Sequence, residues 1–271
     1  MNIGLIVYEN PISRSYIKVL KDANISTKYL ITLNKKSIFP KFISLRQDFK
    51  KNNYWPLQFL KQKKYLYLAH QIEDFFNFPR NFCKEMYKFE NIYEVSNNIE
   101  NVNCEDINDE RSINIVKKLE CYYFLNTGKQ ILKNIFNTDK KFIHIHPGYL
   151  PLIRGADSSL WHINQNNNLG VSSFFMDRKI DEGLILAREN LKMPKFILKD
   201  FDKLDIKTLY RLWFSFFDPL LRSWHLKKIL NKELLSLENV QQINVQGDKS
   251  NYFSFMNEKQ LKDTFVKVFN N

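Results

Sequence analysis

The sequence predicts an α/β protein with an open, mostly parallel β-sheet of the Rossmann-like type. Residues 3–7 form an apolar run typical of a buried strand, 13–22 have helical spacing, and 28–33 form a second strand. This β-α-β order is the unit from which such sheets are built. Of the 271 residues, 44% are hydrophobic and 15% aromatic, which is the composition of a globular protein.

The next part of the chain gives weaker signals. Residues 34–65 interleave Lys with aromatic residues, which suits either stacking on nucleic acid or a base, or an irregular segment packed onto the domain. Residues 66–91 follow neither the helical nor the strand period. The elements predicted after them are a strand at 92–95, a helix at 111–119 capped from 107–110, a strand at 121–125, and a helix that begins at 129–132.

The stretch from 142 to 187 is the most informative. Residues 142–145 form a β-favouring run that ends at Pro147-Gly148. A loop over 148–155 leads to a helix that Asp157 or Ser158 can cap. A turn at 164–168, a strand at 171–176 and a closing strand at 184–187 complete the predicted sheet.

The sequence predicts two regions, a catalytic domain over 1–195 and a smaller C-terminal α+β extension over 196–271. In the extension, apolar and aromatic residues recur at helical spacing over 205–229, and Pro219 is expected to kink or split this helix. Such a stripe indicates core or a homodimer interface. The tail predicts a strand after 242, a turn at Gly247-Asp248, an extended segment at 252–256 and a final helix to Phe269.

Charge and cysteine content limit the partners and the compartment. The net charge of +12 favours an anionic ligand, although a solvated lysine-rich surface explains it equally well. The three cysteines are widely spaced and predict neither a disulfide framework nor a zinc site. We find no secretory signal and no apolar stretch long enough for a membrane span, so a soluble cytoplasmic protein is expected.

His144 and His146 lie two residues apart on the predicted strand, so both side chains face the same side at its carboxyl end. Ligands bind at that end in open α/β sheets. The Gly-x-Gly-x-x-Gly fingerprint is absent, which argues against a dinucleotide. Paired histidines with Asp181 could instead hold a metal in a hydrolase, but we predict no metal site.

The pattern around these histidines resembles the hydroxymethyl- and formyltransferase family, which includes methionyl-tRNA, glycinamide-ribonucleotide and sugar-nucleotide formyltransferases. His144 stands where the family usually has Asn. The resemblance implies the formyltransferase fold, with 10-formyltetrahydrofolate as the formyl donor. The matching pieces are His146-Pro147, Leu150-Pro151, Arg154-Gly155, Gly170-Val171-Ser172 and Asp181-Glu182-Gly183.

The resemblance also implies roles for individual residues. His146 would stabilise the oxyanion and shuttle a proton, and Asp181 would hold its ring in one tautomer. His144 would replace the usual Asn as a second oxyanion donor, provided its other ring nitrogen is held. Arg154 could bind a phosphate or carboxylate, or pair with a nearby acid. The implied folate-binding residues are Gln130, Ile131, Leu132, Met176 and Ile180, and the implied substrate-binding residues are Tyr149, Arg154 and Asp157.

The short tail after residue 194 argues against a tRNA substrate, so nucleic acid is not an expected partner. The resemblance favours an N-formyltransferase acting on a nucleotide-linked amino sugar in surface polysaccharide biosynthesis. The alternatives are a formyltransferase for another small amine or for tRNA, a formyl-tetrahydrofolate hydrolase, a metal-dependent hydrolase using His144 and His146, and a catalytically inactive nucleotide-binding module.

Overall fold

The computed structural model describes residues 2–33, 55–88, 91–231 and 250–270. Its centre is a seven-stranded sheet in the order β3-β2-β1-β4-β5-β7-β8. The first five strands in this order pair in parallel, and β7 is antiparallel to both of its neighbours. The strands are β1 Ile3–Val7, β2 Tyr29–Leu33, β3 Ile99–Val102, β4 Tyr123–Asn126, β5 Lys141–His146, β7 Asn168–Phe175 and β8 Ile185–Lys192.

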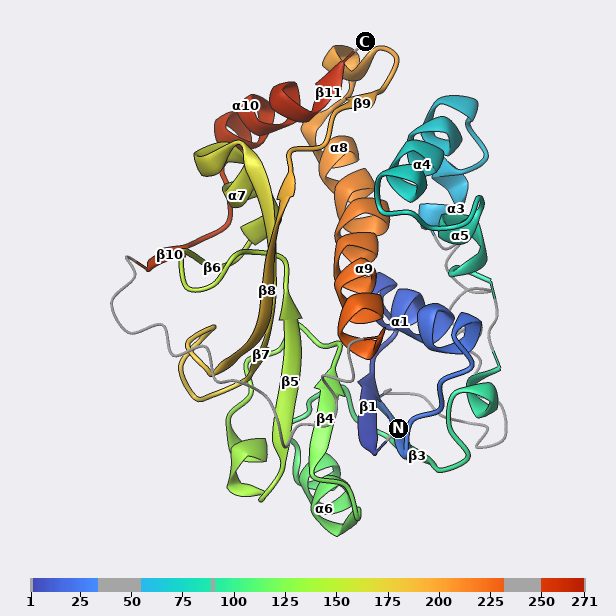
Figure 1. Ribbon diagram of the computed structural model, residues 1–271, viewed down its shortest axis with the longest axis vertical. Coiled ribbons are helices and arrows are strands. Elements are labelled where there is room, and N and C mark those ends of the chain that lie inside the picture. Colours follow the sequence, from blue (N-terminus) through green and yellow to red (C-terminus); the bar gives the residue numbers. More distant parts are fainter. Residues whose placement is uncertain (1, 34–54, 89–90, 232–249, 271) are drawn as a thin grey trace.

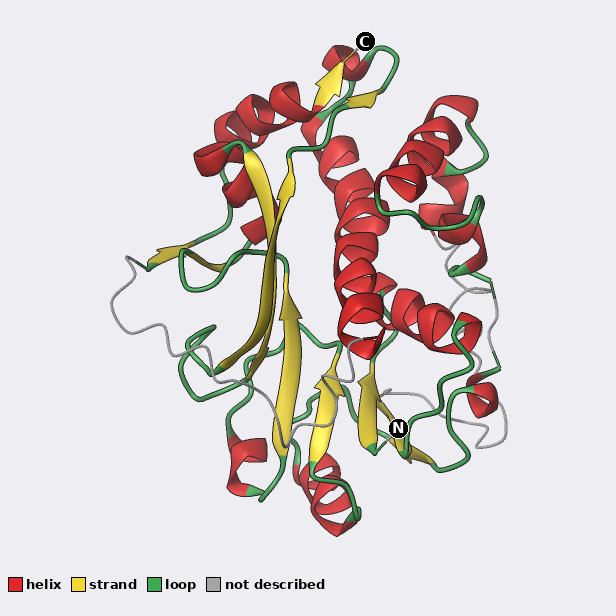
Figure 2. Ribbon diagram, viewed as in Figure 1, coloured by secondary structure: helices red, strands yellow, loops and turns green. Residues whose placement is uncertain are grey.

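Alternate residues of the parallel strands face two different cores. Leu5 and Ile143 pack into the larger core, which contains α1 (Pro11–Asp22) and α9 (Asp218–Asn231). Ile6 and Phe142 pack into the smaller core with α6 (Glu110–Lys118). Helices therefore cover both faces of a buried parallel sheet, as the Rossmann-like prediction requires. Figure 2 shows the strands gathered in one layer with helices around it.

The helix predicted over 205–229 is continuous and is not split at Pro219. It comprises α8 (Ile206–Leu212), a π-helical turn (Trp213–Phe217) and α9, which Figure 1 shows as one long column beside the sheet. Pro219 has no N–H, so the carbonyl of Ser215 loses its usual helical donor. The hydroxyl of Tyr87 donates to that carbonyl instead. A π-helical turn thus absorbs the irregularity that was predicted as a kink.

Segments of the chain after residue 195 pack against residues 153–166 and 196–197. Strand β10 (Asn251–Phe253) pairs in parallel with β6 (Ile153–Gly155), and β11 (Phe269–Asn270) pairs with β9 (Phe196–Ile197). Helix α10 (Glu258–Val268) packs against α7 (Ser158–Asn166). The division at residue 195 stays a prediction, and segments from both sides of it share the larger core.

Several local predictions were wrong. Residues 92–95 are no strand: Ile92–Glu94 form a 3-10 turn because the side chain of Asn91 accepts from the N–H of Tyr93, and β3 begins later. Residues 129–132 do not begin a helix, and a 3-10 turn follows at Asn134–Asn137. The region from 55 to 88 is helical, with α3 Trp55–Phe59, α4 Lys63–Phe75 and α5 Phe82–Glu85.

Other predictions concern the chain ends and the charge. The excursion predicted after residue 34 lies largely outside the described residues, as do the strand after 242 and the turn at Gly247-Asp248. None of the helices in the described ranges is long and apolar enough to cross a membrane.

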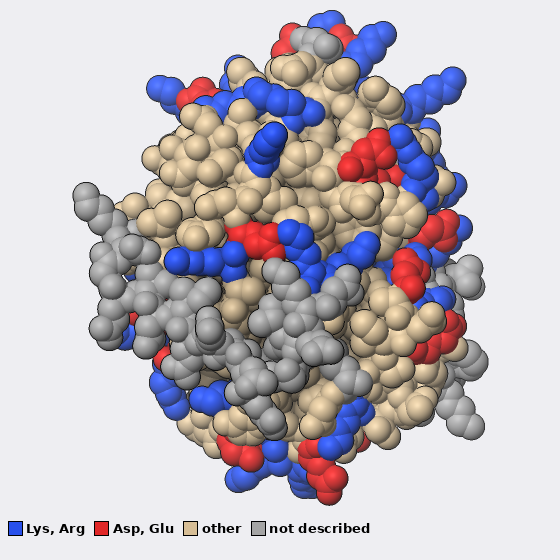
Figure 3. Space-filling view, in the orientation of Figure 1, with Lys and Arg blue, Asp and Glu red and all other residues tan. Residues whose placement is uncertain are grey.

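On the face drawn in Figure 3, Lys and Arg side chains lie scattered, several of them beside Asp or Glu. The three cysteines are buried and free.

Candidate functional site

The candidate site lies where β4 and β5 separate. Their pairing ends at Leu125 and Ile143, so the last residues of β5 extend beyond β4. His144 and His146 face the same side as Phe142, as their two-residue spacing predicts. Asp181, remote along the chain, places Oδ2 3.6 Å from Nδ1 of His146. The convergence of this imidazole and carboxylate, on which the sequence-based interpretation depends, is present.

Hydrogen bonding defines the tautomer of His146. Its Nε2 lies 2.9 Å from the carbonyl oxygen of Ile153, which can only accept. Nε2 therefore carries the hydrogen, and Nδ1 of the neutral ring turns its lone pair toward Asp181. Burial lowers the pKa of His146, although Asp181 opposes this. The ring is thus poised to accept a proton at Nδ1, where Asp181 would stabilise the imidazolium. The tautomer is fixed by Ile153, rather than by Asp181 as predicted.

Strand β6 holds both members of this pair. The carbonyl of Ile153 accepts from His146, and the N–H of Gly155 donates to Asp181 Oδ2 at 2.8 Å. Gly155 has φ of 96°, in the left-handed region that favours glycine. In this conformation of the short strand its N–H donates to Asp181.

Gly155→Ala is therefore expected to damage both stability and the site. The new Cβ would lie 2.1 Å from the carbonyl oxygen of Phe253, and the positive φ adds strain. We expect a loss of roughly 2 kcal/mol or more in the free energy of unfolding, measured by urea denaturation. Asn251→Ala, at an exposed position of β10, is the control and should change stability by less than about 0.5 kcal/mol. An unaltered Gly155→Ala protein would contradict the role given to β6.

Both ring nitrogens of His144 are engaged. Nδ1 lies 3.2 Å from the carbonyl oxygen of Asn126, so Nδ1 carries the hydrogen. Nε2 lies 3.2 Å from Nη1 of Arg222 and accepts from it. Burial, as the larger cause, and the charge of Arg222, as the second, lower the pKa of His144 to about 3, so the ring is neutral. In this arrangement the ring has no N–H left for an oxyanion.

Arg222 and Asp218, on α9, form a buried ion pair that the sequence analysis missed. Arg222 Nε donates to Asp218 Oδ2 at 2.9 Å, and the side chains are only 7% and 1% exposed. Nη1 donates to His144 and to the carbonyl of Ile145, which lies beyond the end of β4. The sequence shows only an Asp and an Arg four residues apart on a helix, outside its apolar stripe, which is also the spacing of an ordinary surface pair.

A second cation, on the exposed residue Lys129, lies near Arg222 and Asp218. Lys129, in the loop after β4, places Nζ 5.0 Å from the ring centroid of Phe214. Partial desolvation of the ammonium group lowers the pKa of Lys129, and the charge of Asp218 counters this. Arg222 therefore contacts the neutral His144, and the charges of Asp218 and Lys129 interact with each other beside it.

The residues predicted to bind folate lie in two loops, after β4 and after β7. The side chain of Gln130 is engaged by the N–H of Ile107 and the carbonyl of Glu105. Leu132 is buried, whereas Ile131 and Ile180 are 52% and 39% exposed. The two loops are joined where Asn126 Nδ2 lies 3.6 Å from the sulfur of Met176.

This region fits a pterin-like ring in one respect. Within the described ranges, the backbone N–H groups of Gln130, Ile131 and Leu132 have no hydrogen-bond partner. Free amide donors beside exposed aliphatic side chains suit a flat heterocycle rich in acceptors. Folate binding by these residues stays a prediction.

The predicted substrate-binding residues are spread over a wider area. Arg154 pairs with Glu182 and donates to Ser250, so it makes the ion pair with a nearby acid that was the alternative to ligand binding. The ring of Tyr149 lies 4.6 Å below the guanidinium of Arg188. Asp157 precedes α7, but its side chain makes no capping hydrogen bond: it accepts from the hydroxyl of Tyr210 at 2.7 Å and from the N–H of Met256 at 3.0 Å.

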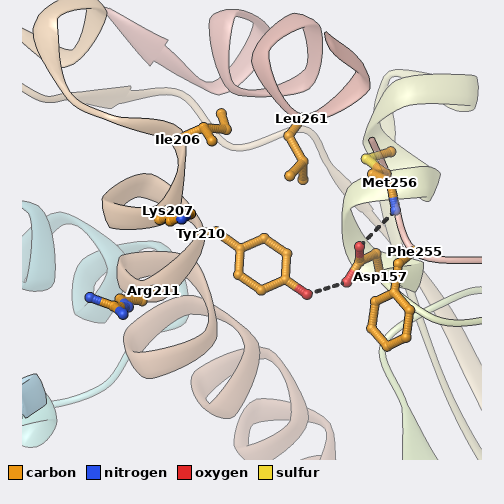
Figure 4. Close-up of a pocket in the computed structure, with 8 residues that line it drawn as sticks. All are labelled: Asp157, Ile206, Lys207, Tyr210, Arg211, Phe255, Met256 and Leu261. Atoms are coloured by element: carbon orange, nitrogen blue, oxygen red, sulfur yellow. Dashed lines mark hydrogen bonds between the residues drawn. The ribbon is translucent and has the colours of Figure 1, made fainter. Parts of the chain in front are cut away.

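Asp157 also lies at the edge of an open pocket of roughly 300 Å³, shown in Figure 4. Helix α8 contributes Lys207 and Arg211 to it, and Phe255 lies on the opposite side. The pocket combines aromatic and basic side chains around a carboxylate that is already hydrogen bonded.

A metal site does not fit these residues. In the described part of the chain, no three His, Cys, Asp or Glu side chains are grouped so that they could hold a metal ion. The lone pair of His144 Nε2 faces a guanidinium, which would repel a cation. The geometry therefore gives no support to the metal-dependent alternative.

The pH dependence of turnover would test how the histidine and carboxylate interact. If His146 accepts a proton, kcat should rise with pH through a pKa below the ordinary 6.5. Asp181→Asn removes the charge that raises this pKa, so the rising limb should move to lower pH while kcat falls. The measurement is a pH–rate profile of both proteins, with Glu182→Gln as the neighbouring control. A profile that Asp181→Asn leaves in place would contradict the coupling.

No family model matches the sequence, and no curated protein matches it. Among solved structures, the chain is similar to a sugar N-formyltransferase from Shewanella sp FDAARGOS_354, with 14% identity over 97% of this chain and 86% of that chain and a TM-score of 0.50. It is also similar to a 4-N formyltransferase from Francisella tularensis, with 14% identity over 98% and 87% and a TM-score of 0.51. The predicted formyltransferase fold is confirmed.

Proposed function

We propose that the protein is an N-formyltransferase that moves the formyl group of 10-formyltetrahydrofolate to the amine of a nucleotide-linked amino sugar. The observation that carries the proposal is the approach of His146 and Asp181 to 3.6 Å at the carboxyl end of β5. The fold supports it, since the chain is similar over nearly its whole length to structures described as a sugar N-formyltransferase and a 4-N formyltransferase.

When bound, the folate supplies an electrophilic formyl carbon, and Gln130, Ile131, Leu132, Met176 and Ile180 are proposed to hold it. The transfer makes a bond from the amine nitrogen to that carbon and breaks the bond to the folate nitrogen. His146 Nδ1 accepts the proton that the amine loses and returns it to the departing folate nitrogen. Asp181 stabilises the ring while it is charged.

The acceptor is proposed from charge as well as from fold. A nucleotide-linked sugar carries a diphosphate, and the net charge of +12 favours such an anion. Tyr149 and Asp157 are the proposed substrate contacts. Such a reaction belongs to cytoplasmic synthesis of surface polysaccharide precursors. A homodimer through the C-terminal region is part of the same proposal, because Tyr252 and Phe255 are 59% and 73% exposed there.

The test is to incubate the purified protein with 10-formyltetrahydrofolate and a panel of nucleotide-linked amino sugars, with charged initiator tRNA as a further acceptor. Mass spectrometry of the products separates the alternatives. A formylated sugar supports the proposal, and release of formate alone indicates a hydrolase. Unchanged folate with every acceptor refutes formyl transfer.

A further inference from the structure

Arg222 has hydrogen-bond donors that its neighbours do not use. A guanidinium has five N–H bonds. Nε uses one on Asp218, and Nη1 uses its two on His144 and the carbonyl of Ile145. Nη2 donates to none of the residues that the structure describes, and it is absent from the fully buried polar atoms without a partner. The small exposed part of Arg222 therefore includes the nitrogen that still has two hydrogens to donate.

The position of this group results from how the sheet ends. Helix α9 packs on the face of the sheet that carries Ile143 and Ile145, whereas the histidines lie on the opposite face. Arg222 crosses from one face to the other where β4 stops at Asn126, and its guanidinium occupies the place that a longer β4 would fill. The buried Asp218 and the acceptor nitrogen of His144 hold the guanidinium of Arg222 in position.

In this arrangement neither histidine has an N–H free to donate to the formyl oxygen of a bound folate. The N–H of His144 is directed to Asn126, and the N–H of His146 is directed to Ile153. We propose that Arg222, through Nη2, donates to the formyl oxygen as negative charge develops on it. His144 is then a positioning residue that accepts from Nη1. This inference rests on the proposed function and names the donor group that formyl transfer would require.

The test separates Arg222 from His144. Removing Arg222 alone would leave Asp218 buried and unpaired, so the variant is Arg222→Met with Asp218→Leu, which removes the pair as a unit. The matched control is Arg80→Met with Asp74→Leu, an exposed pair on the surface. His144→Leu is the third variant. Circular dichroism and thermal melting establish that each variant is folded. If the double change does not fold, Arg222→Lys replaces it, because this variant retains a cation beside Asp218.

Two measurements are made on each protein. The first is kcat with 10-formyltetrahydrofolate and the acceptor found above; we expect a loss on the order of 10²- to 10³-fold for the Arg222 variants and no loss for the control. The second is the infrared stretch of a ¹³C-labelled formyl group in bound 10-formyl-5,8-dideazafolate, without any acceptor. A donor to the oxygen lowers this frequency. The lowering should be present in wild type and in the control, and absent in the Arg222 variants.

The outcomes distinguish the two proposals. If folded Arg222 variants keep kcat within about threefold of wild type, or if the frequency shift disappears with His144→Leu and persists without Arg222, the assignment of Arg222 is overturned and formyl transfer stands. If wild type transfers the formyl group to no acceptor, the proposed function fails, and the role of Arg222 in formyl transfer fails with it. A shift and a rate that both follow Arg222 support the assignment.

Discussion

Replacing His146 by alanine is expected to lower kcat for formyl transfer by on the order of 10²- to 10⁴-fold, the usual contribution of a positioned general base. The reason is that Nδ1 of the neutral ring is the proton acceptor and that Asp181, 3.6 Å away, stabilises the resulting charge. Burial lowers the pKa of His146, so the neutral form predominates at pH 7. The measurement is single-turnover formylation of the acceptor sugar at saturating folate.

Folate affinity and folding serve as the controls for this experiment. His146 contacts Ile153 and Asp181, and it lies outside the two loops proposed to hold the folate. We therefore expect binding of a non-reacting folate, measured by calorimetry, to stay within about threefold of wild type. His70→Ala, which changes a histidine on α4, is the matched control for the loss of an imidazole. A His146→Ala enzyme that retains more than about a tenth of kcat would remove His146 from the mechanism.

The sequence was informative where local chemistry decides the structure. The apolar run at 3–7 and the strand that ends at Pro147 predicted the sheet, whereas the meeting of His146 with Asp181 was implied by the resemblance of the motifs that contain them. These signals are local, since strand propensity, Pro and Gly act on their own neighbourhood. The antiparallel direction of β7 was not predictable in the same way, because a buried strand has the same pattern in either direction.

The missed residues depend on contacts between distant segments. Asp218 and Arg222 have the spacing of an ordinary surface pair on a helix, and only the packing of α9 on the sheet shows that both are buried. The role of Ile153 comes from a backbone carbonyl, which no side-chain pattern reveals. His144 was expected to donate to the substrate, and its hydrogen bond to Asn126 is a property of the place where β4 ends.

Acid destabilisation centred on His144 is the second large effect that we expect. Burial and the Arg222 charge lower the pKa of His144 to about 3 in the folded protein, whereas the unfolded chain has the ordinary value of 6.5. Below pH 6.5 the unfolded state binds a proton that the folded state does not bind. The stabilisation associated with the neutral ring is therefore complete above pH 6.5 and is lost progressively as the pH falls toward 3. At pH 4.5 the loss should be roughly 2 to 3 kcal/mol.

His144→Asn isolates this contribution. The amide does not titrate, and it can still donate to the carbonyl of Asn126 and accept from Arg222. Urea unfolding of both proteins at pH 7.5 and pH 4.5 gives the change in stability with pH for each. Groups remote from residue 144 titrate alike in the two proteins, so the difference between the two changes reports on His144 and its immediate neighbours. Equal changes would mean that the ring of His144 is protonated in the folded state well above pH 3, and the neutral acceptor that positions Arg222 would then not exist.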